Sequence, residues 1–505
     1  MSVPAPRQDT NSAPPETAGR DTSKDGLANR LELWALTHGA GLWRAIQKGP
    51  LEGPFNRLLI NSGIEKVEPR PYRLSTKAPY TSWDTLTDKS YNTRSLAAVS
   101  QDGLPDVKDV AKLFEREDEI PCEKSTVLFA YVAQWFTDGF LRSKRDEEDD
   151  SLRDITKNVS THEVDLTQLY GMNNDITAML RTPLQDGDGL LKSQLIGDEE
   201  FPPFLCENGE MKPEFTTVPG LQPLGFKNIS AEQRDRLFAM GSDSSNAQIG
   251  YAMLNVLFLR EHNRIARELA EMYAKSSAWP ADPVARSERL FGTARNILTV
   301  LLIKVVIEEY INHIAPYHFR FKFDPNRFGK ERWMRPNWVA VEFNLLYRWH
   351  SLIPSQLVIG DKPLKLRDTL FQMQLLIEHG LGQVFEDSSN QRAGRVGLRN
   401  TDPWLLEKTE VPSIAEGRKV GLDRFNAYRP YCKFPKVTSF DQITSDLEVR
   451  RGLRDLYDGD VNNLEFYVGL FAEDRRPNSV LPSMVGRLVG LHAFSQLMTN
   501  PLLAP

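Results

Sequence analysis

The sequence predicts a large, mainly helical protein, and two observations support this fold class. Four long segments place apolar residues at the spacing of helices that pack on a core: residues 246–275, 286–313, 366–380 and 482–499. Convincing alternation of apolar and polar residues, the pattern typical of strands, is rare. The composition, 40% hydrophobic and 26% charged, is that of a globular chain with enough apolar residues for a sizeable core.

The N-terminal region divides into two parts. Residues 1–26 are polar, contain only Arg7 and Arg20 as basic residues and show no apolar run, so we expect a disordered tail rather than a secretory signal. Residues 27–68 contain short amphipathic pieces separated by Gly and Pro. Such helices either pack on the domain or lie on a membrane surface.

The remaining elements follow in order. Residues 69–121, rich in Pro, Ser, Thr, Asp and Gly, predict a long irregular connection. Helical periodicity returns at residues 125–143, and the charge run at 144–150 predicts a solvated loop. The most apolar stretch, residues 297–307, is too short to span a bilayer and predicts a buried helix.

Charge and cysteine content exclude some classes of protein. The net charge of -6 gives no electrostatic reason to expect nucleic-acid binding. Cys122, Cys206 and Cys432 are too few and too scattered for a disulfide framework or a CxxC metal site. We therefore expect a reducing, cytoplasmic location.

The segment VEFNLLYRWHSLIP, residues 341–354, carries the most chemistry. If it is helical, Tyr347 and His350 are three residues apart and share a face. An imidazole there can ligate a metal or haem iron, and a phenol within one turn can pass an electron to that centre. On spacing alone, a histidine beside aromatic residues is more often a hydrogen-bonded core residue.

This segment closely resembles the proximal segment of cyclooxygenases, a branch of the animal haem peroxidases. Six further strings resemble cyclooxygenase strings in the same order: THEVDLTQLYG (161–171), LFLREHNRIA (257–266), KVVIEEY (304–310), FKFDPN (321–326), LEFYVGL (464–470) and RPNSV (476–480). The resemblance covers roughly residues 37–505. It implies a single all-α haem peroxidase domain over residues 69–505, with haem b as cofactor and without the cysteine-rich module of the vertebrate enzymes.

The resemblance assigns roles to individual residues. It implies that His350 is the proximal iron ligand and that Tyr347 forms the radical that abstracts hydrogen from the substrate. Tyr310 is implied to hydrogen-bond Tyr347, while Trp349 and Tyr467 are implied to support the radical and the ligand. Without the resemblance, Tyr310 and Tyr467 would be ordinary core tyrosines.

The distal side departs from the family pattern. Gln134 matches the distal glutamine, but Asp138 stands where the family has its distal histidine. The two are four residues apart and can share one helix face. Because a carboxylate is a weaker base than imidazole at neutral pH, we expect slow peroxide turnover with Asp138 as the substitute base. The alternative is that Asp138 is tolerated in an enzyme with little peroxidase activity.

The substrate side also departs from the family. Tyr317 matches a tyrosine that binds the substrate carboxylate at the channel mouth, but the accompanying arginine is missing. Its region reads NSGIEKVEP, with Lys66 as the nearest cation beside Glu65 and Glu68. Carboxylate recognition is thus open, and the last helical segment is expected to supply channel walls: Met484, Val485, Phe494 and Leu497.

The leading hypothesis is a haem-dependent fatty-acid oxygenase (dioxygenase) that takes an unsaturated fatty acid or related lipid, O2 and a peroxide activator. A second is a peroxidase that oxidises small reductants, and a third is a catalytically silent haem-binding protein. Retention of both Tyr347 and Tyr310 argues against silence, because haem binding alone needs neither phenol. The resemblance also implies peripheral membrane association and allows a homodimer.

Overall fold

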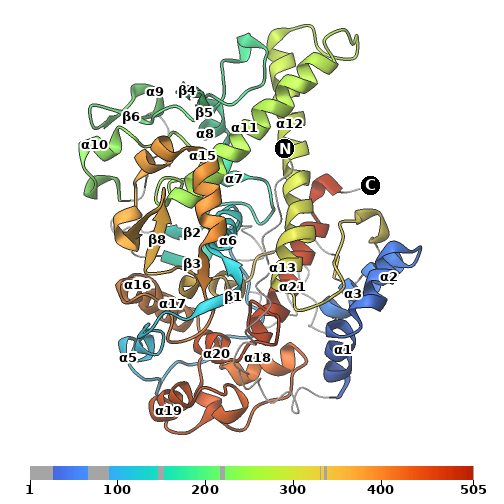
Figure 1. Ribbon diagram of the computed structural model, residues 1–505, viewed down its shortest axis with the longest axis vertical. Coiled ribbons are helices and arrows are strands. Elements are labelled where there is room, and N and C mark those ends of the chain that lie inside the picture. The colour runs from blue at the N-terminus through green and yellow to red at the C-terminus, as the bar shows by residue number, and fades with distance from the viewer. Residues whose placement is uncertain are drawn as a thin grey trace.

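The computed structural model describes residues 27–65, 90–145, 153–216, 222–223, 225–329, 331, 333–334 and 338–503. Helices dominate these residues, which confirms the fold class (Figure 1). The α-helices are α1 Leu27–Thr37, α2 Ala40–Lys48, α3 Glu52–Glu65, α5 Val107–Lys112, α6 Val127–Asp138, α7 Thr167–Tyr170, α8 Asn174–Leu180, α9 Pro213–Thr216, α10 Ala231–Arg234, α11 Ile249–Met272, α12 Pro283–Val305, α13 Asn312–Ile314, α14 Val341–Leu346, α15 Met373–Asn390, α16 Pro403–Leu405, α17 Val411–Lys419, α18 Phe425–Tyr431, α19 Leu447–Leu456, α20 Phe466–Ala472 and α21 Ser483–Met498.

The described strands are short and form antiparallel pairs. The pairs are β1 Pro121–Thr126 with β10 Arg392–Gly394, β2 Ser143–Arg145 with β3 Arg153–Asn158, β4 Gln194–Ile196 with β5 Glu199–Phe201, β6 Cys206–Glu207 with β7 Glu210–Met211, and β8 Gln356–Ile359 with β9 Lys362–Lys365. The β8–β9 hairpin turns through Gly360 and Asp361, both with positive φ, which suits a two-residue turn. The charge run at 144–150 begins in β2, and residues 146–150 lie outside the described residues.

The centre of the fold is helix α6, which packs against α11 and α15 (Figure 1). Gly250 of α11 lies against the ring of Tyr131, so close that a Cβ at this position would overlap the ring. The Trp135 indole N–H donates to the Asn255 side-chain oxygen at 2.8 Å, which satisfies a polar group inside this contact. A glycine and a buried hydrogen bond thus bring the two helices together.

The long predicted helices form, with differences at their ends. Residues 246–275 form α11, and 482–499 form α21. Helix α12 begins where Asp282 accepts from the Ala285 N–H at 2.8 Å, with Pro283 in the first turn. The predicted helix 366–380 starts later than expected, because residues 366–369 form a 3-10 turn and α15 begins at Met373. Gly380, with a non-helical φ of 75°, interrupts α15 at the predicted end, and a second helical stretch continues to Asn390.

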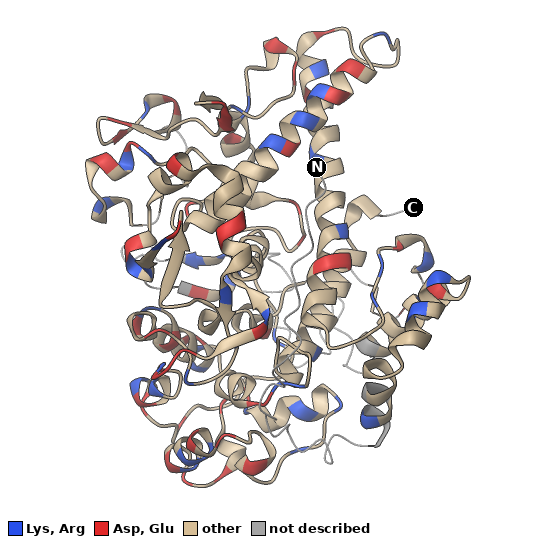
Figure 2. Cartoon of the chain, in the orientation of Figure 1, with Lys and Arg blue, Asp and Glu red and all other residues tan. Residues whose placement is uncertain are grey.

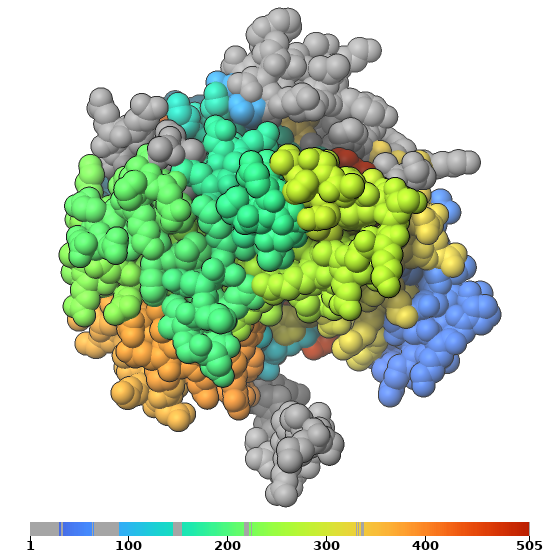
Figure 3. Space-filling view, turned by 90° about the horizontal axis from the view of Figure 1, so that it is seen from above, coloured from blue at the N-terminus to red at the C-terminus, as the bar shows by residue number. Residues whose placement is uncertain are grey.

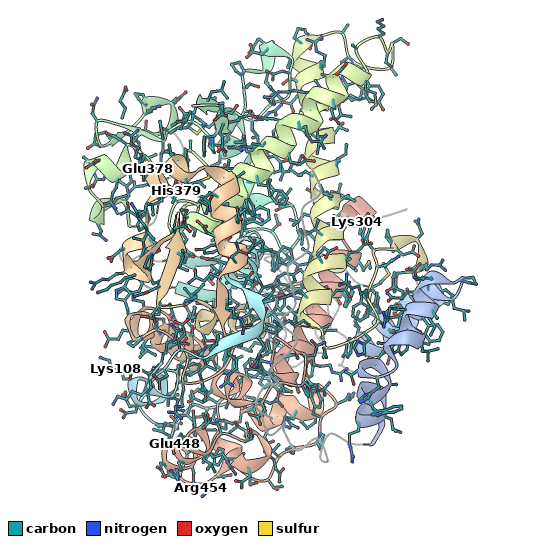
Figure 4. The ribbon with its side chains drawn as sticks, in the orientation of Figure 1. Lys108, Lys304, Glu378, His379, Glu448 and Arg454 are labelled. Atoms are coloured by element: carbon teal, nitrogen blue, oxygen red, sulfur yellow. The ribbon has the colours of Figure 1, made fainter. Side chains whose placement is uncertain are left out.

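Within the apolar stretch at residues 297–307, the side chains on only one face of α12 are buried. Ile297, Leu301 and Val305 are exposed, and Lys304 projects outward from the same helix (Figure 4). Residues 283–314 are long and apolar enough to cross a membrane by length and composition, and half of their most apolar window is buried within the protein. The expectation of a fully buried helix is therefore corrected to a half-buried one.

Helices α1–α3 form a separate layer at one side of the molecule, where they project in both views (Figures 1 and 3). Helix α21 lies between this layer and α12–α13. Basic and acidic residues are interspersed along the described chain (Figure 2). Cys122, Cys206 and Cys432 are buried free thiols, which agrees with the expectation that they form no disulfide framework.

Candidate active site

His350 is held by a buried carboxylate that the sequence did not single out. Its Nδ1 lies 3.0 Å from Oε1 of Glu410, whose side chain is 1% exposed. A carboxylate accepts hydrogen bonds only, so Nδ1 carries the proton and Nε2 is left with its lone pair. This arrangement fixes the ring and makes Nε2 the nitrogen that can ligate a metal.

Glu410 also accepts hydrogen bonds from two hydroxyl groups. The Tyr467 hydroxyl donates to Oε2 at 2.7 Å, and the Thr401 hydroxyl donates to Oε1 at 2.9 Å. Burial, and then the negative charge of Glu410, raises the pKa of Tyr467 well above its ordinary value, so this phenol stays protonated. Tyr467 therefore acts on His350 through Glu410 and not by direct contact.

Glu410 ends a π-helical segment, Leu406–Glu410, just before α17. Pro412 lacks an N–H, which removes one α-helical hydrogen bond at this point and favours the wider turn. Nothing in the sequence distinguishes Glu410 from the exposed Glu407 three residues earlier. Only the packing around His350 identifies it.

Tyr347 does not continue a helix to His350, contrary to the expectation. Helix α14 ends at Leu346, and Trp349 has φ of -90° and ψ of 51° before a 3-10 turn begins at His350. The Trp349 indole N–H closes this bend by donating to the Leu346 carbonyl at 2.6 Å. Its ring stacks on that of Tyr347 with centroids 4.6 Å apart. Trp349 thus positions Tyr347 through a tight turn.

The hydroxyls of Tyr347 and Tyr310 are buried beside each other, and neither has another hydrogen-bond partner among the described residues. Burial raises the pKa of both phenols, and the neighbouring Tyr347 raises that of Tyr310 further. The two phenols are thus close enough to act on each other through their hydroxyl groups. Phe129 stacks on the ring of Tyr310 with centroids 5.2 Å apart.

Tyr310 lies in a second π-helical segment, Val306–Ile311. The cause is local, because the side-chain amide of Asn312 donates to the Glu308 carbonyl at 2.8 Å and also to the Phe321 carbonyl at 2.8 Å. A side chain inserted into the backbone ladder widens the helix. Both π-segments therefore carry a residue of the candidate site, as is common for this irregularity.

The two distal residues both lie on α6. Gln134 is exposed although eight of the twelve residues of this central helix are buried, which indicates an open space inside the fold. Asp138 is engaged: its Oδ2 accepts from Tyr251 at 2.5 Å, from Arg142 at 2.6 Å and from Ser242 at 3.0 Å. The carboxyl group of Asp138 is therefore positioned by a hydrogen-bond network and is not isolated.

An apolar pocket lies between α21, the end of α12–α13 and the N-terminal helices. Tyr317 and Phe494 line it, as expected for channel residues. Met484, Val485 and Leu497 do not line it and are buried elsewhere in the core. Successive helical residues turn by about 100°, so Met484 and Val485 point away from the lining face, and Leu497 lies about one turn beyond Phe494.

Of the charged residues in the region of the missing arginine, Lys66 and Glu68 lie outside the described residues.

Comparison with known proteins agrees with this geometry. Residues 119–499 match the animal haem peroxidase family. Prostaglandin G/H synthase 1 of Mus musculus is 32% identical over 93% of this chain and 75% of the relative, and prostaglandin G/H synthase 2 of Cavia porcellus is 31% identical over 94% and 75%.

Solved structures show the same fold at lower identity. Fatty acid alpha-dioxygenase of Oryza sativa matches with a TM-score of 0.67 and 18% identity, over 95% of this chain and 89% of that one. Peroxidase A of Dictyostelium discoideum matches with a TM-score of 0.64 and 17% identity, over 86% and 92%. From the extent of the family match and the identity to its curated relatives, this chain is a member of the animal haem peroxidase family and a homologue of the prostaglandin G/H synthases.

Proposed function

We propose that the chain is a haem-dependent fatty-acid oxygenase that uses a radical on Tyr347. Its homologues are named prostaglandin G/H synthases, and the solved structures of similar fold include fatty acid alpha-dioxygenases. The observation that carries the proposal is the Tyr347 hydroxyl, which is buried beside Tyr310, three residues from His350, and has no other hydrogen-bond partner among the described residues. A structural tyrosine would normally satisfy a buried hydroxyl.

The family implies haem, and the described residues fit it. Nε2 of His350 would ligate the iron of haem b, while Glu410 fixes the ring and increases its basicity. The exposed Gln134 indicates space beside α6 for a planar group. When bound, haem would supply the oxidising equivalents obtained from a peroxide.

The steps carried by this chain follow from Tyr347. Loss of one electron and the phenolic proton leaves a neutral oxygen radical on Tyr347. That radical takes a hydrogen atom from a substrate C–H bond, which restores the phenol and leaves a carbon radical. O2 then adds to that carbon. The aromatic rings around Tyr347, Phe343 at 5.1 Å and Trp349 at 4.6 Å between centroids, keep water away from the radical.

Asp138 supports a restricted peroxidase role. Arg142 forms an ion pair with Asp138, and the effect of its burial is outweighed by the charges of Asp138 and Asp243, which raise the pKa of Arg142. Because Oδ2 already accepts three hydrogen bonds, proton transfer must compete with this network. We therefore expect peroxide activation to be slow, as the missing distal histidine suggests.

Helices α1–α3 support peripheral membrane association. Leu31, Trp34, Leu42 and Leu58 are 59–63% exposed on this projecting layer. Aromatic and leucine side chains on amphipathic helices are typical of membrane surfaces. Flotation with liposomes should recover the protein, whereas a Trp34→Asp, Leu42→Asp variant should remain unbound. Flotation of both proteins to the same extent would contradict this part of the proposal.

The deciding experiment compares Tyr347→Phe with wild type after haem loading. We expect the variant to lose oxygen uptake with unsaturated fatty acids but to retain guaiacol oxidation by peroxide. Tyr131→Phe, which removes the hydroxyl of a buried tyrosine whose ring packs on Gly250 of α11, is the matched control and should keep both activities. Guaiacol oxidation without any oxygen uptake in wild type would favour the peroxidase hypothesis. Absence of both activities would favour a silent haem-binding protein.

A further inference from the structure

The apolar pocket beside α21 has a basic end. Arg476 and Arg487 line it together with Ser483, while the wall residues Ile311, Ile314 and Phe494 are apolar. Among the described lining residues none is acidic. A pocket with one cationic end and otherwise apolar walls suits an amphiphilic ligand that carries a single negatively charged group.

One face of α21 organises this pocket. Ser483, Gly486, Arg487, Gly490 and Phe494 recur at helical spacing and all line it. A Cβ built on Gly486 or Gly490 would meet no atom within 4 Å, so the two glycines leave open space along this face. The face therefore forms a track that leads from Arg487 to Phe494.

Three arginines gather at the basic end. Arg476, Arg487 and Arg429 all lie over the ring of Phe434, with their guanidinium carbons 5.8, 5.3 and 5.5 Å from its centroid. Glu473 accepts from Arg429 at 2.9 Å and from the Met484 N–H at 2.6 Å. Cation–π contact with Phe434 helps to hold the three guanidinium groups in place.

Ser483 gives an independent sign of a ligand. Ser483 is 7% exposed and lines the pocket. Its hydroxyl makes no hydrogen bond within the part of the chain that the structure describes. A buried hydroxyl without a partner costs free energy unless a ligand satisfies it. A carboxylate oxygen is a suitable acceptor for it.

We propose that Arg487 and Arg476, assisted by Ser483, bind the carboxylate of the fatty-acid substrate, and that the hydrocarbon chain follows the Gly490–Phe494 face of α21. The identity of the substrate rests on the proposed function. These groups come from α21 and the loop before it, not from the region of residues 61–69 in which the family resemblance places its arginine.

This orientation decides which carbon reacts. Phe343 packs on Tyr347 and stacks on His492, whose ring centroid is 4.6 Å away. His492 lies five residues after Arg487, about 7.5 Å along the helix axis. The arginine side chain leans toward the N-terminus of α21, which increases the separation. The carbon next to a carboxyl group is only about 1.5 Å from it, so a carbon in the interior of the chain reaches Tyr347.

The first test is equilibrium binding to the haem-loaded protein without peroxide, with oleate and methyl oleate as probes. Loss of a charge-assisted contact should weaken oleate binding by about tenfold or more in Arg487→Gln, while methyl oleate binding stays unchanged. Arg487→Lys should recover part of the oleate affinity, and Arg476→Gln combined with Arg487→Gln should lose more. The matched control is Arg451→Gln, which removes an exposed arginine of α19 and should bind both probes like wild type.

Equal loss of oleate and methyl oleate, or unchanged oleate affinity, would overturn the assignment. A second variant, Gly490→Leu, fills the open track and should weaken both probes. These measurements need no turnover, so failure of the oxygenase proposal would show as absent oxygen uptake with the oleate preference intact. With linoleate as substrate, oxygen at an interior carbon is expected, and oxygen at the carbon beside the carboxylate would contradict the orientation.

Discussion

The charge of Glu410 is expected to control how tightly His350 holds haem. Replacing Glu410 by Gln keeps the shape of the side chain and an oxygen for the His350 Nδ1–H, but it removes the negative charge. A charge-assisted hydrogen bond contributes about 1.5–3 kcal/mol and a neutral one about 0.5–1.5 kcal/mol. The midpoints of these ranges differ by about 1.25 kcal/mol, which corresponds to a roughly eightfold weaker haem affinity, near the lower end of the effects found for partners of metal-ligating histidines.

The assay is a titration of the apoprotein with haem followed by absorbance, combined with measurement of the iron reduction potential. Weaker donation from His350 should also raise that potential in Glu410→Gln. The matched control, Glu407→Gln, changes an exposed acidic residue of the same segment and should leave both quantities unchanged. Unchanged affinity and potential in Glu410→Gln would refute the argument that the charge of Glu410 acts on the ligand.

Three further predictions follow from other buried groups. Tyr310→Phe should alter the lifetime or line shape of the Tyr347 radical in electron paramagnetic resonance, because the two phenols are coupled, and an identical signal would show that they are not. Burial lowers the pKa of His262 to about 4 from its ordinary 6.5. Between these two pH values the unfolded state binds more protons than the folded state. The free energy of unfolding should therefore fall by about 3 kcal/mol in total as the pH decreases through this window. Urea unfolding of His262→Gln, which can keep the contacts to Tyr170 and Gly189, should lack this pH-dependent part, and an unaltered slope would count against it. Glu473→Ala should lower the free energy of unfolding by about 3–5 kcal/mol, since it leaves the fully buried Arg429 without its carboxylate, and a loss under 1 kcal/mol would contradict this.

The sequence alone predicted much of the fold and the central pair of site residues. Apolar periodicity located α6, α11, α12 and α21, because a helix that packs on a core must repeat its apolar residues every three to four positions. The string around Tyr347 and His350 predicted a haem-dependent oxidoreductase, since its residue types and order resemble one family. The family and the class of enzyme are confirmed by the comparisons. The roles of individual residues stay predictions.

The tertiary structure decided what depends on contacts between distant segments. Glu410 lies 60 residues from His350 and Arg142 lies 101 residues from Asp243, and no local pattern marks either pair. The bend between Tyr347 and His350 also needed the structure, because helical spacing says nothing about where backbone hydrogen bonds break. The same holds for the basic end of the pocket, where residues of α21 and the preceding loop meet N-terminal helices more than 400 residues away in the chain. Residue types determine which chemistry this protein can carry out, whereas long-range packing determines which of those residues meet.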